Sequence, residues 1–415
     1  MNSYGSSPPL PITDAADEIV YYESSEPFRA AGEVKLGVGF ADPGRVALFT
    51  APPTTLTIRN FKINNAYLDT ACMLLLKDGR KIPETAYLLP QYDYDHAQVL
   101  HSQLVELDKD TEYVIGCTRD HGYYHWLTQA VPTIDWAVRS RPHDNISLGL
   151  PGMNAFHMAS VELLGHGDVP RLHLVPHHHF YFPRVSHSEF LTGSMPFGIS
   201  RAAQSTFQRL RNAVDASRWP RAPIVYVART DSMRRVALNE QELVDVLIAE
   251  EVCVVVPGNL SLAEQIALFK QADAVIGPHG AGLTNAVFCK PGAIVYELLP
   301  EHFLNPCFSR LVQATGLHYW ADIFASHGEG DSQERNWVID INVVMERLRS
   351  IRQRIAEDAP TRVALGGTSG AMQFLRQNAA TIPEVGALET TRHDRGERTG
   401  KGLMSRLWRR RPDRR

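Results

Sequence analysis

The feature that most constrains this chain is a regular alternation of apolar runs and amphipathic stretches between residues 224 and 297. Short runs rich in Val and Ile have the length of buried strands, and the intervening stretches of ten to twelve residues have helical spacing. Strands separated by single helices pair in parallel through right-handed crossovers. We therefore predict a β-α-β-α-β-loop-α-β order and an α/β domain built on a parallel sheet.

Two of these helices carry start signals. Ser261 stands three residues before Glu264, which is the spacing of a capping box. Asn239 and Glu242 repeat that spacing with Asn in the place of Ser or Thr. We predict that both pairs cap the helices that follow them.

A glycine-rich turn follows the third strand, with the sequence Gly-Pro-His-Gly-Ala-Gly-Leu-Thr-Asn at 277–285. Glycines let backbone N–H groups approach a ligand, and the first N–H groups of a helix attract anions. Glu297, at the end of the next strand, could accept two sugar hydroxyls. Many doubly wound domains bind nothing at such a turn, and the third glycine of the dinucleotide pattern is replaced here by Asn285. The candidate ligand-binding residues of the turn are His279, Gly280, Ala281, Gly282, Leu283, Thr284 and Asn285.

Two arginines follow the first strand of the same region. Ligands bind parallel sheets at the carboxyl ends of the strands, so Arg229, Arg235, the glycine turn and Glu297 should gather at one edge. Guanidinium groups beside a glycine turn favour a diphosphate ligand. The alternative is that each arginine is a solvated surface charge.

The rest of the chain divides by composition. Short apolar runs such as Val46–Phe49, separated by turn signals, predict a strand-rich N-terminal part. Beyond residue 360 the chain turns polar and glycine-rich. We predict four segments: a flexible lead at 1–26, an N-terminal domain at 27–200, a C-terminal domain at 201–358, and a disordered linker with a basic tail at 359–415.

A second polar cluster lies at 119–134, where a predicted helix begins with Asp120, His121 and His125. Its aromatic and aliphatic residues have helical spacing, so an ordinary packed helix with a structural His125 is the alternative to a site. Three consecutive histidines at 177–179 are unsuited to one metal, because they cannot all point at it from a strand. We predict a loop between domains there and no metal site.

Composition limits the partners and the compartment. The chain has no run of about 18 apolar residues, no basic-then-apolar leader and five scattered cysteines, from which we expect a cytoplasmic protein with reduced thiols. The net charge is −4, yet residues 392–415 hold ten Lys or Arg and three Asp or Glu, so the body is acidic. An acidic body argues against nucleic acid as a partner. The tail segment 402–415 has one apolar face among arginines and either lies on the inner face of an anionic membrane or is a solubilising tail.

Two stretches together resemble glycosyltransferase family 61, in the bacterial branch often labelled capsular polysaccharide biosynthesis proteins. The first is Tyr-Tyr-His-Trp-Leu at 123–127 with Pro132; the second runs from Tyr226-Val-Ala-Arg229 through Leu260-Ser-Leu-Ala-Glu-Gln265 and the glycine turn to Glu297. The chain departs from the family's frequent residues at three positions: Gly122 in place of Asn, Gln129 in place of Asp or Glu, and Gly258 in place of Glu.

The resemblance implies a GT-B-like architecture of two Rossmann-like domains facing across a cleft, with the acceptor at 27–200 and the nucleotide-sugar at 201–358. It implies an inverting, metal-independent transfer, without cofactor, from a nucleotide-sugar, UDP-linked by expectation, to a glycan hydroxyl. Arg229 and the turn carry over as donor-binding positions, Glu297 as a ribose contact, and His125 as the marked residue of the acceptor side. The general base stays open between His125 and Asp120. Two alternatives remain: a non-catalytic sugar-nucleotide-binding partner subunit and a sugar-nucleotide epimerase.

Overall fold

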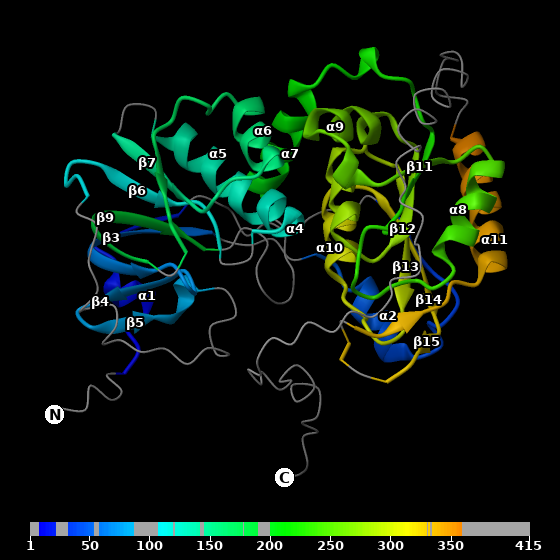
Figure 1. Cartoon of the computed structure of the whole chain (residues 1–415), viewed down its shortest axis with the longest axis horizontal. Coiled ribbons are helices and arrows are strands. Elements are labelled where there is room, and N and C mark those ends of the chain that lie inside the picture. The colour runs from blue at the N-terminus through cyan, green and yellow to red at the C-terminus, as the bar shows by residue number, and fades with distance from the viewer. Residues whose placement is uncertain are drawn as a thin grey trace, which may run out of the picture.

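The computed structural model describes residues 8–21, 32–53, 58–86, 107–118, 121–141, 145–176, 178–189, 200–329, 331–332 and 334–358. Its main elements are two sheets with helices packed on them, so the predicted α/β class is confirmed (Figure 1). Asp120, His177 and the predicted tail, including 402–415, lie outside the described residues. Within the described part of the chain, no helix combines the length and the apolar character needed to cross a bilayer.

The C-terminal sheet is parallel throughout, as the strand–helix alternation predicts. Its strand order is β11-β10-β12-β13-β14-β2, so the chain adds strands on one side of β10 and then moves to the other side. The order therefore reverses between β10 and β12. The strands are β2 (Val34–Leu36), β10 (Ile224–Val227), β11 (Cys253–Val255), β12 (Ala274–Pro278), β13 (Ile294–Pro300) and β14 (His318–Phe324).

Helices cover both faces of this sheet. On one face, Leu247 of α8 and Leu348 of α11 pack in the same apolar cluster as Tyr296. On the other face, Ile266 of α9 and Leu311 of α10 pack in the cluster that holds Val295, and Figure 1 shows these two layers on either side of the strands. The elements are α8 (Glu240–Ala249), α9 (Leu262–Gln271), α10 (Cys307–Ala314), α11 (Ile341–Glu357) and the 3-10 helix η6 (Ala281–Phe288).

One of the two predicted caps is confirmed. Ser261 Oγ accepts from the Glu264 N–H at 3.3 Å, and Glu264 Oε2 accepts from the Ser261 N–H at 2.8 Å. Asn239 caps nothing, because its side chain donates to the Ile339 carbonyl at 2.8 Å and accepts from the Ile339 N–H at 2.9 Å. This long-range pairing fastens the start of α8 to the segment before α11, and the sequence around Asn239 carries no sign of it.

The N-terminal sheet contains both antiparallel and parallel strand pairs. The prediction of a strand-rich N-terminal part is confirmed, but only the parallel portion of this sheet resembles a Rossmann-like domain. Strands β1, β3, β4 and β5 pair antiparallel, whereas β9, β6, β7 and β8 pair in parallel. Its strands are β1 (Glu18–Tyr21), β3 (Arg59–Asp69), β4 (Leu74–Lys77), β5 (Arg80–Ile82), β6 (Glu112–Ile115), β7 (Ile146–Leu150), β8 (Arg171–His173) and β9 (His179–Ser188), and its helices are α5 (Val131–Ser140) and α6 (Ala155–Leu163). Shorter elements are α1 (Ile12–Ala15), η1 (Pro83–Thr85), α4 (Tyr123–His125), the π-helix η3 (Trp126–Ala130), η4 (Ala216–Arg218), η5 (Pro257–Asn259), β15 (Ser326–His327) and β16 (Asn336–Trp337).

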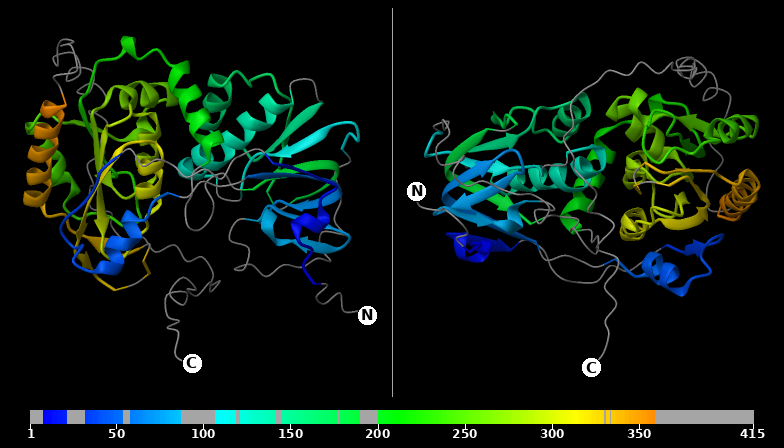
Figure 2. Two further views of the ribbon diagram at one scale, coloured as in Figure 1. Left: turned by 180° about the vertical axis from the view of Figure 1, so that it is seen from behind. Right: turned by 60° about the horizontal axis from the view of Figure 1, so that its bottom comes forward.

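The predicted segment boundaries need two corrections. Residues 18–21 fall in the predicted flexible lead, 1–26, but form β1, which pairs with β3. Residues 34–50 fall in the predicted N-terminal domain, 27–200, but β2 pairs with β14 of the C-terminal sheet. Figure 2 shows this early segment beside the later sheet. The chain therefore contributes β1 to the N-terminal sheet, then β2 to the C-terminal sheet, and then β3 to the N-terminal sheet.

Val46–Phe49 is helical rather than a strand. It lies in α2 (Pro43–Thr50), which begins where the Asp42 carboxylate accepts from the Gly44 N–H at 2.6 Å and where proline occupies the first helical position. At the other end, Arg310 of α10 donates to the Leu48 carbonyl at 2.9 Å. The local capping chemistry and this contact outweigh the strand-like composition of the run.

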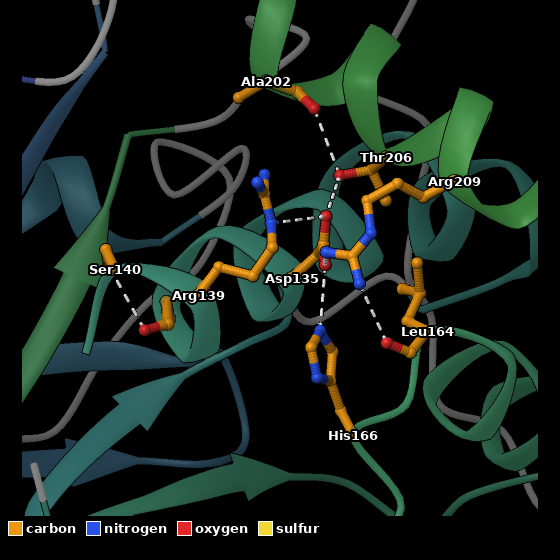
Figure 3. Close-up of polar contacts among 9 residues, drawn as sticks. Asp135, Arg139, Ser140, Leu164, His166, Ala202, Thr206 and Arg209 are labelled. Carbon is orange, nitrogen blue, oxygen red and sulfur yellow. Dashed lines mark hydrogen bonds and ion pairs between the residues drawn. The ribbon is translucent and has the colours of Figure 1, made fainter. Parts of the chain in front are cut away.

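Helix α7 (Arg201–Ala213) joins the two halves, because it contacts α5 and α6 on one side and α9 and η6 on the other. Side chains converge on Asp135 of α5, whose carboxylate is fully buried (Figure 3). It contacts His166 Nε2 at 2.9 Å, accepts from Thr206 Oγ at 2.8 Å, and pairs with Arg139 and Arg209. This cluster fixes α7 to the N-terminal half.

Replacing Asp135 by Asn should destabilise the protein by about 2 kcal/mol, because an amide cannot replace the charge-assisted hydrogen bonds that the buried carboxylate accepts, whereas the partly exposed Arg139 and Arg209 can turn to water. Burial alone would raise the pKa of Asp135, but the hydrogen bonds from His166 and Thr206 and the arginine charges hold it below its ordinary value. A depressed pKa contributes stability above the unfolded-state value of about 3.9, and that stability is lost as the pH falls through the folded-state pKa. Urea unfolding measured from pH 7 down to about pH 2 covers both effects, because the loss lies below the unfolded-state pKa. Asp168→Asn, at an exposed site after α6, is the control and should unfold like the wild type.

Candidate functional site

Arg229 and the glycine turn meet where the strand order reverses. Arg229 follows β10 and Gly280 follows β12, and this reversal is where open parallel sheets bind ligands. The Arg229 guanidinium donates to the His279 carbonyl at 2.9 Å and to Ser232 Oγ at 2.8 Å. A Cβ built on Gly280 would lie 2.6 Å from Arg229 Nε. Gly280 therefore makes room for the arginine side chain.

Glu240 fixes the backbone that carries Arg229. Its Oε1 accepts from the Arg229 N–H at 2.8 Å and from the Tyr226 hydroxyl at 3.0 Å, and the residue is buried. Burial lowers the pKa of Arg229 even though the Glu240 charge opposes this. Sequence reasoning gave Glu240 no role, although it lies directly after Asn239 within the family-like stretch.

Arg235 lies beside Arg229, so like charges gather here. Its guanidinium lies 4.4 Å from the centre of the Phe303 ring, and its backbone carbonyl accepts from the Trp337 indole at 2.8 Å. Burial, and then the Arg229 charge, lower the pKa of Arg235 to about 10. Burial lowers the pKa of His302, and the charges of Arg335 and Arg235 lower it further. The cluster is more basic than predicted, and an anion bound there would relieve the repulsion.

His302 and Arg335 were not among the predicted site residues. Arg335 comes from the short β15–β16 region, a hundred residues after Arg235 in the chain. Nothing in the local sequence around either residue marks it as part of a site at the far end of β10.

Glu297 holds His279 and is not placed to bind a ribose, which corrects the prediction for it. Its carboxylate is fully buried, with Oε1 at 2.5 Å from His279 Nδ1 and Oε2 accepting from the Tyr319 hydroxyl. His279 itself is buried between the rings of Phe303 and Phe308, at centroid distances of 5.3 and 5.1 Å. Both carboxylate oxygens are occupied by protein groups, so Glu297 acts on a ligand only through His279.

The remainder of the turn separates into exposed backbone and buried side chains. Ala281 is exposed and Gly282 half-buried, whereas Leu283, Thr284 and Asn285 are fully buried. The turn leads into a 3-10 helix, not the α-helix expected. The first two residues can therefore present N–H groups to a ligand, and the side chains of the last three serve packing.

The motif on the other half of the molecule contacts this turn. The Tyr123 hydroxyl donates to Asn285 Oδ1 at 2.7 Å, and the Asn285 amide donates to Gln265 Oε1 at 2.8 Å. The ring of Tyr124 lies edge-on to Phe308 at 5.6 Å and to His125 at 5.2 Å. Two aromatic rings thus link His125 to His279.

His125 ends α4, and the chain continues directly into a π-helix, a feature common at functional sites. The Gln129 amide oxygen lies 3.4 Å from His125 Nδ1. An amide oxygen only accepts, so this contact favours the tautomer that carries hydrogen on Nδ1 and the lone pair on Nε2. Among the residues that the structure describes, no group of three or more His, Cys, Asp or Glu is arranged to hold a metal ion.

Residues 123–296 match the family model described as Glycosyltransferase 61. They form a glycosyltransferase family 61 domain, as the resemblance predicted. The chain is 33% identical over 63 residues to a beta-1,2-xylosyltransferase of Arabidopsis thaliana, covering 15% of this chain and 12% of the relative. It is 28% identical over 148 residues to the EGF domain-specific O-linked N-acetylglucosamine transferase of Gallus gallus (33% and 27%), and 35% identical over 99 residues to the protein of that name from Drosophila melanogaster (23% and 19%).

The chain spans about an eighth of the length of the Arabidopsis thaliana relative and about a quarter of the length of the Gallus gallus relative. The family 61 domain begins at Tyr123 and holds both arginines and the whole glycine turn. His302, Tyr319 and Arg335 follow it in the chain yet reach the same site. The names of the relatives support a glycosyltransferase, and none of them bears on a capsular role.

Proposed function

We propose that this protein is an inverting glycosyltransferase that moves a sugar from a nucleotide-sugar, UDP-linked by expectation, to a hydroxyl of a glycan. The observation that carries the proposal is the packing of Arg229 against Gly280 at the reversal of the strand order, with Arg235 beside it. The family 61 domain and its transferase relatives support the same class. We further propose a GT-B-like arrangement, with the acceptor on the N-terminal half, and a cytoplasmic location.

The proposed transfer requires the site to stabilise the leaving diphosphate and to deprotonate the attacking hydroxyl. A departing diphosphate gains negative charge, and two guanidinium groups with the N–H groups of Ala281 and Gly282 stabilise it without requiring a metal cofactor. The attacking hydroxyl must lose a proton on the opposite side of the sugar. His125, with its lone pair on Nε2, is the proposed base for that step.

Nucleoside diphosphates and nucleotide-sugars should raise the melting temperature of the protein. A ligand at a hundred times its Kd stabilises the folded state by about 2.7 kcal/mol, which a thermal-shift panel detects. Purified protein should also hydrolyse the matching nucleotide-sugar slowly without acceptor. Binding without hydrolysis or transfer would instead indicate a non-catalytic partner subunit, and an isomerised nucleotide-sugar formed without acceptor would indicate an epimerase. If no nucleotide compound binds, the proposal is wrong.

A further inference from the structure

His279 has one ring nitrogen occupied and one left for a ligand. Nδ1 lies 2.5 Å from Glu297 Oε1, and a carboxylate only accepts, so Nδ1 carries a hydrogen. The Tyr319 hydroxyl donates to the other oxygen of Glu297 and keeps that carboxylate in place. Phe303 and Phe308 fix the plane of the imidazole. Among the residues that the structure describes, Nε2 has no hydrogen-bond partner, so this nitrogen can meet a bound molecule.

The charges that act on His279 come from two parts of the chain. Glu297 faces it from β13, and Arg229 and Arg235 face it from the segment after β10. Burial and then the Glu297 charge raise the pKa of Tyr319 of β14 and of Cys307 of α10, so both of these neighbours stay uncharged. Burial lowers the pKa of His279, the Glu297 charge opposes this, and the two arginine charges lower it further. At pH 8, well above this lowered pKa, the ring without a ligand is neutral and Nε2 holds a lone pair.

An anion between the arginines reverses this balance. A diphosphate held by Arg229 and Arg235 would offset the two guanidinium charges that act on His279, and a phosphate oxygen within reach of Nε2 requires a hydrogen-bond donor rather than a lone pair. We propose that His279 takes up one proton from solvent when a nucleoside diphosphate binds, and that Nε2–H then donates to a phosphate oxygen. The proton returns to solvent when the diphosphate leaves. This inference rests on the proposed function.

The geometry gives Glu297 a part in this uptake. A buried imidazolium is costly unless it is paired, and the Glu297 carboxylate, held by Tyr319, is the counter-charge in contact with it. Glu297 is therefore a positioning residue that acts through His279. An amide at this position could still accept from Nδ1 but could not stabilise the charged ring.

Calorimetry with UDP at pH 8, in buffers of different ionisation enthalpy, tests the proposal on the unmodified protein. At this pH a terminal phosphate, with a pKa of about 6, is already ionised. Uptake adds the ionisation enthalpy of the buffer to the measured heat, so we expect a positive slope of roughly one proton per UDP. His279→Gln should bind UDP more weakly with a slope of zero, and Glu297→Gln should lose most of the slope.

His318→Gln is the matched control, since burial also lowers the pKa of this histidine, yet it lies at the amino end of β14, at the edge of the sheet opposite the site. It should keep the slope. A wild-type heat that does not depend on the buffer overturns the inference and leaves the proposed function intact, as does a slope that survives in His279→Gln or vanishes in His318→Gln. Failure of UDP, ADP, GDP and CDP all to bind contradicts the proposed function and the inference together.

Discussion

Replacing His125 by Ala should lower kcat by about 10²- to 10⁴-fold, the usual contribution of a general base, with little change in the affinity for donor. Both expectations follow from the position of His125 in the structure. His125 stands at the junction of α4 and the π-helix, on the half of the molecule opposite Arg229, and Tyr124 and Phe308 connect it to the donor turn. Two aromatic rings separate it from His279 of the donor turn, so donor binding should survive its loss. Initial rates at saturating donor, with the melting temperature as a check on folding, measure this.

Gln129→Glu tests the role of His125 through the pH dependence of kcat, which would not change if His125 had only a structural role. A carboxylate in place of the amide beside Nδ1 favours the charged imidazolium over the neutral ring. The base is then protonated at higher pH, so the acidic limb of the kcat profile should move to higher pH. His178→Ala, at an exposed histidine directly before the start of β9, should change neither rate nor profile. Full activity in His125→Ala, together with loss of activity in Asp120→Asn, would assign the base to Asp120 instead.

Much of the site could be predicted because its signals are local. The strand-helix alternation fixes a parallel sheet, and in a parallel sheet every loop after a strand emerges at one edge. Arg229 and Gly280 were expected together on that argument alone, and the structure brings them into contact. The Ser261 capping box is local in the same way, since both its members lie within one turn of the helix.

The parts that could not be predicted depend on distant pairings. Nothing near Val34 indicates that it will pair with Tyr319, and nothing near Glu297 indicates that both its oxygens will be taken by protein groups. A carboxylate at the end of a strand looks the same in sequence whether it faces a ligand or the core. Asn239 shows the same limit, because its partner, Ile339, lies a hundred residues away.

The role of Arg229 in transfer can be tested in two independent ways, by removing its side chain and by displacing it. Arg229→Ala should lower kcat by about 10²- to 10³-fold, the usual cost of removing one donor to a developing negative charge, and should weaken binding of UDP. Gly280→Ala should reproduce part of that loss without touching the arginine. Its new methyl group would lie 2.6 Å from Arg229 Nε and 2.7 Å from Cδ, so the guanidinium must move. The backbone of Gly280 is extended, with φ at 177°, and accepts alanine without strain.

Gly258→Ala is the matched control at the same edge of the sheet. A Cβ there would meet its nearest atom, Asp231 Oδ2, at 3.4 Å, an ordinary contact, so this variant should keep wild-type kcat and UDP affinity. Combining Gly280→Ala with Arg229→Ala separates steric from electrostatic causes. If Gly280 acts by making room for Arg229, the double variant should be no worse than Arg229→Ala, because contacting residues are not additive. Losses that multiply would mean that Gly280 contacts the donor directly, and wild-type activity in Arg229→Ala would remove the arginine from the mechanism.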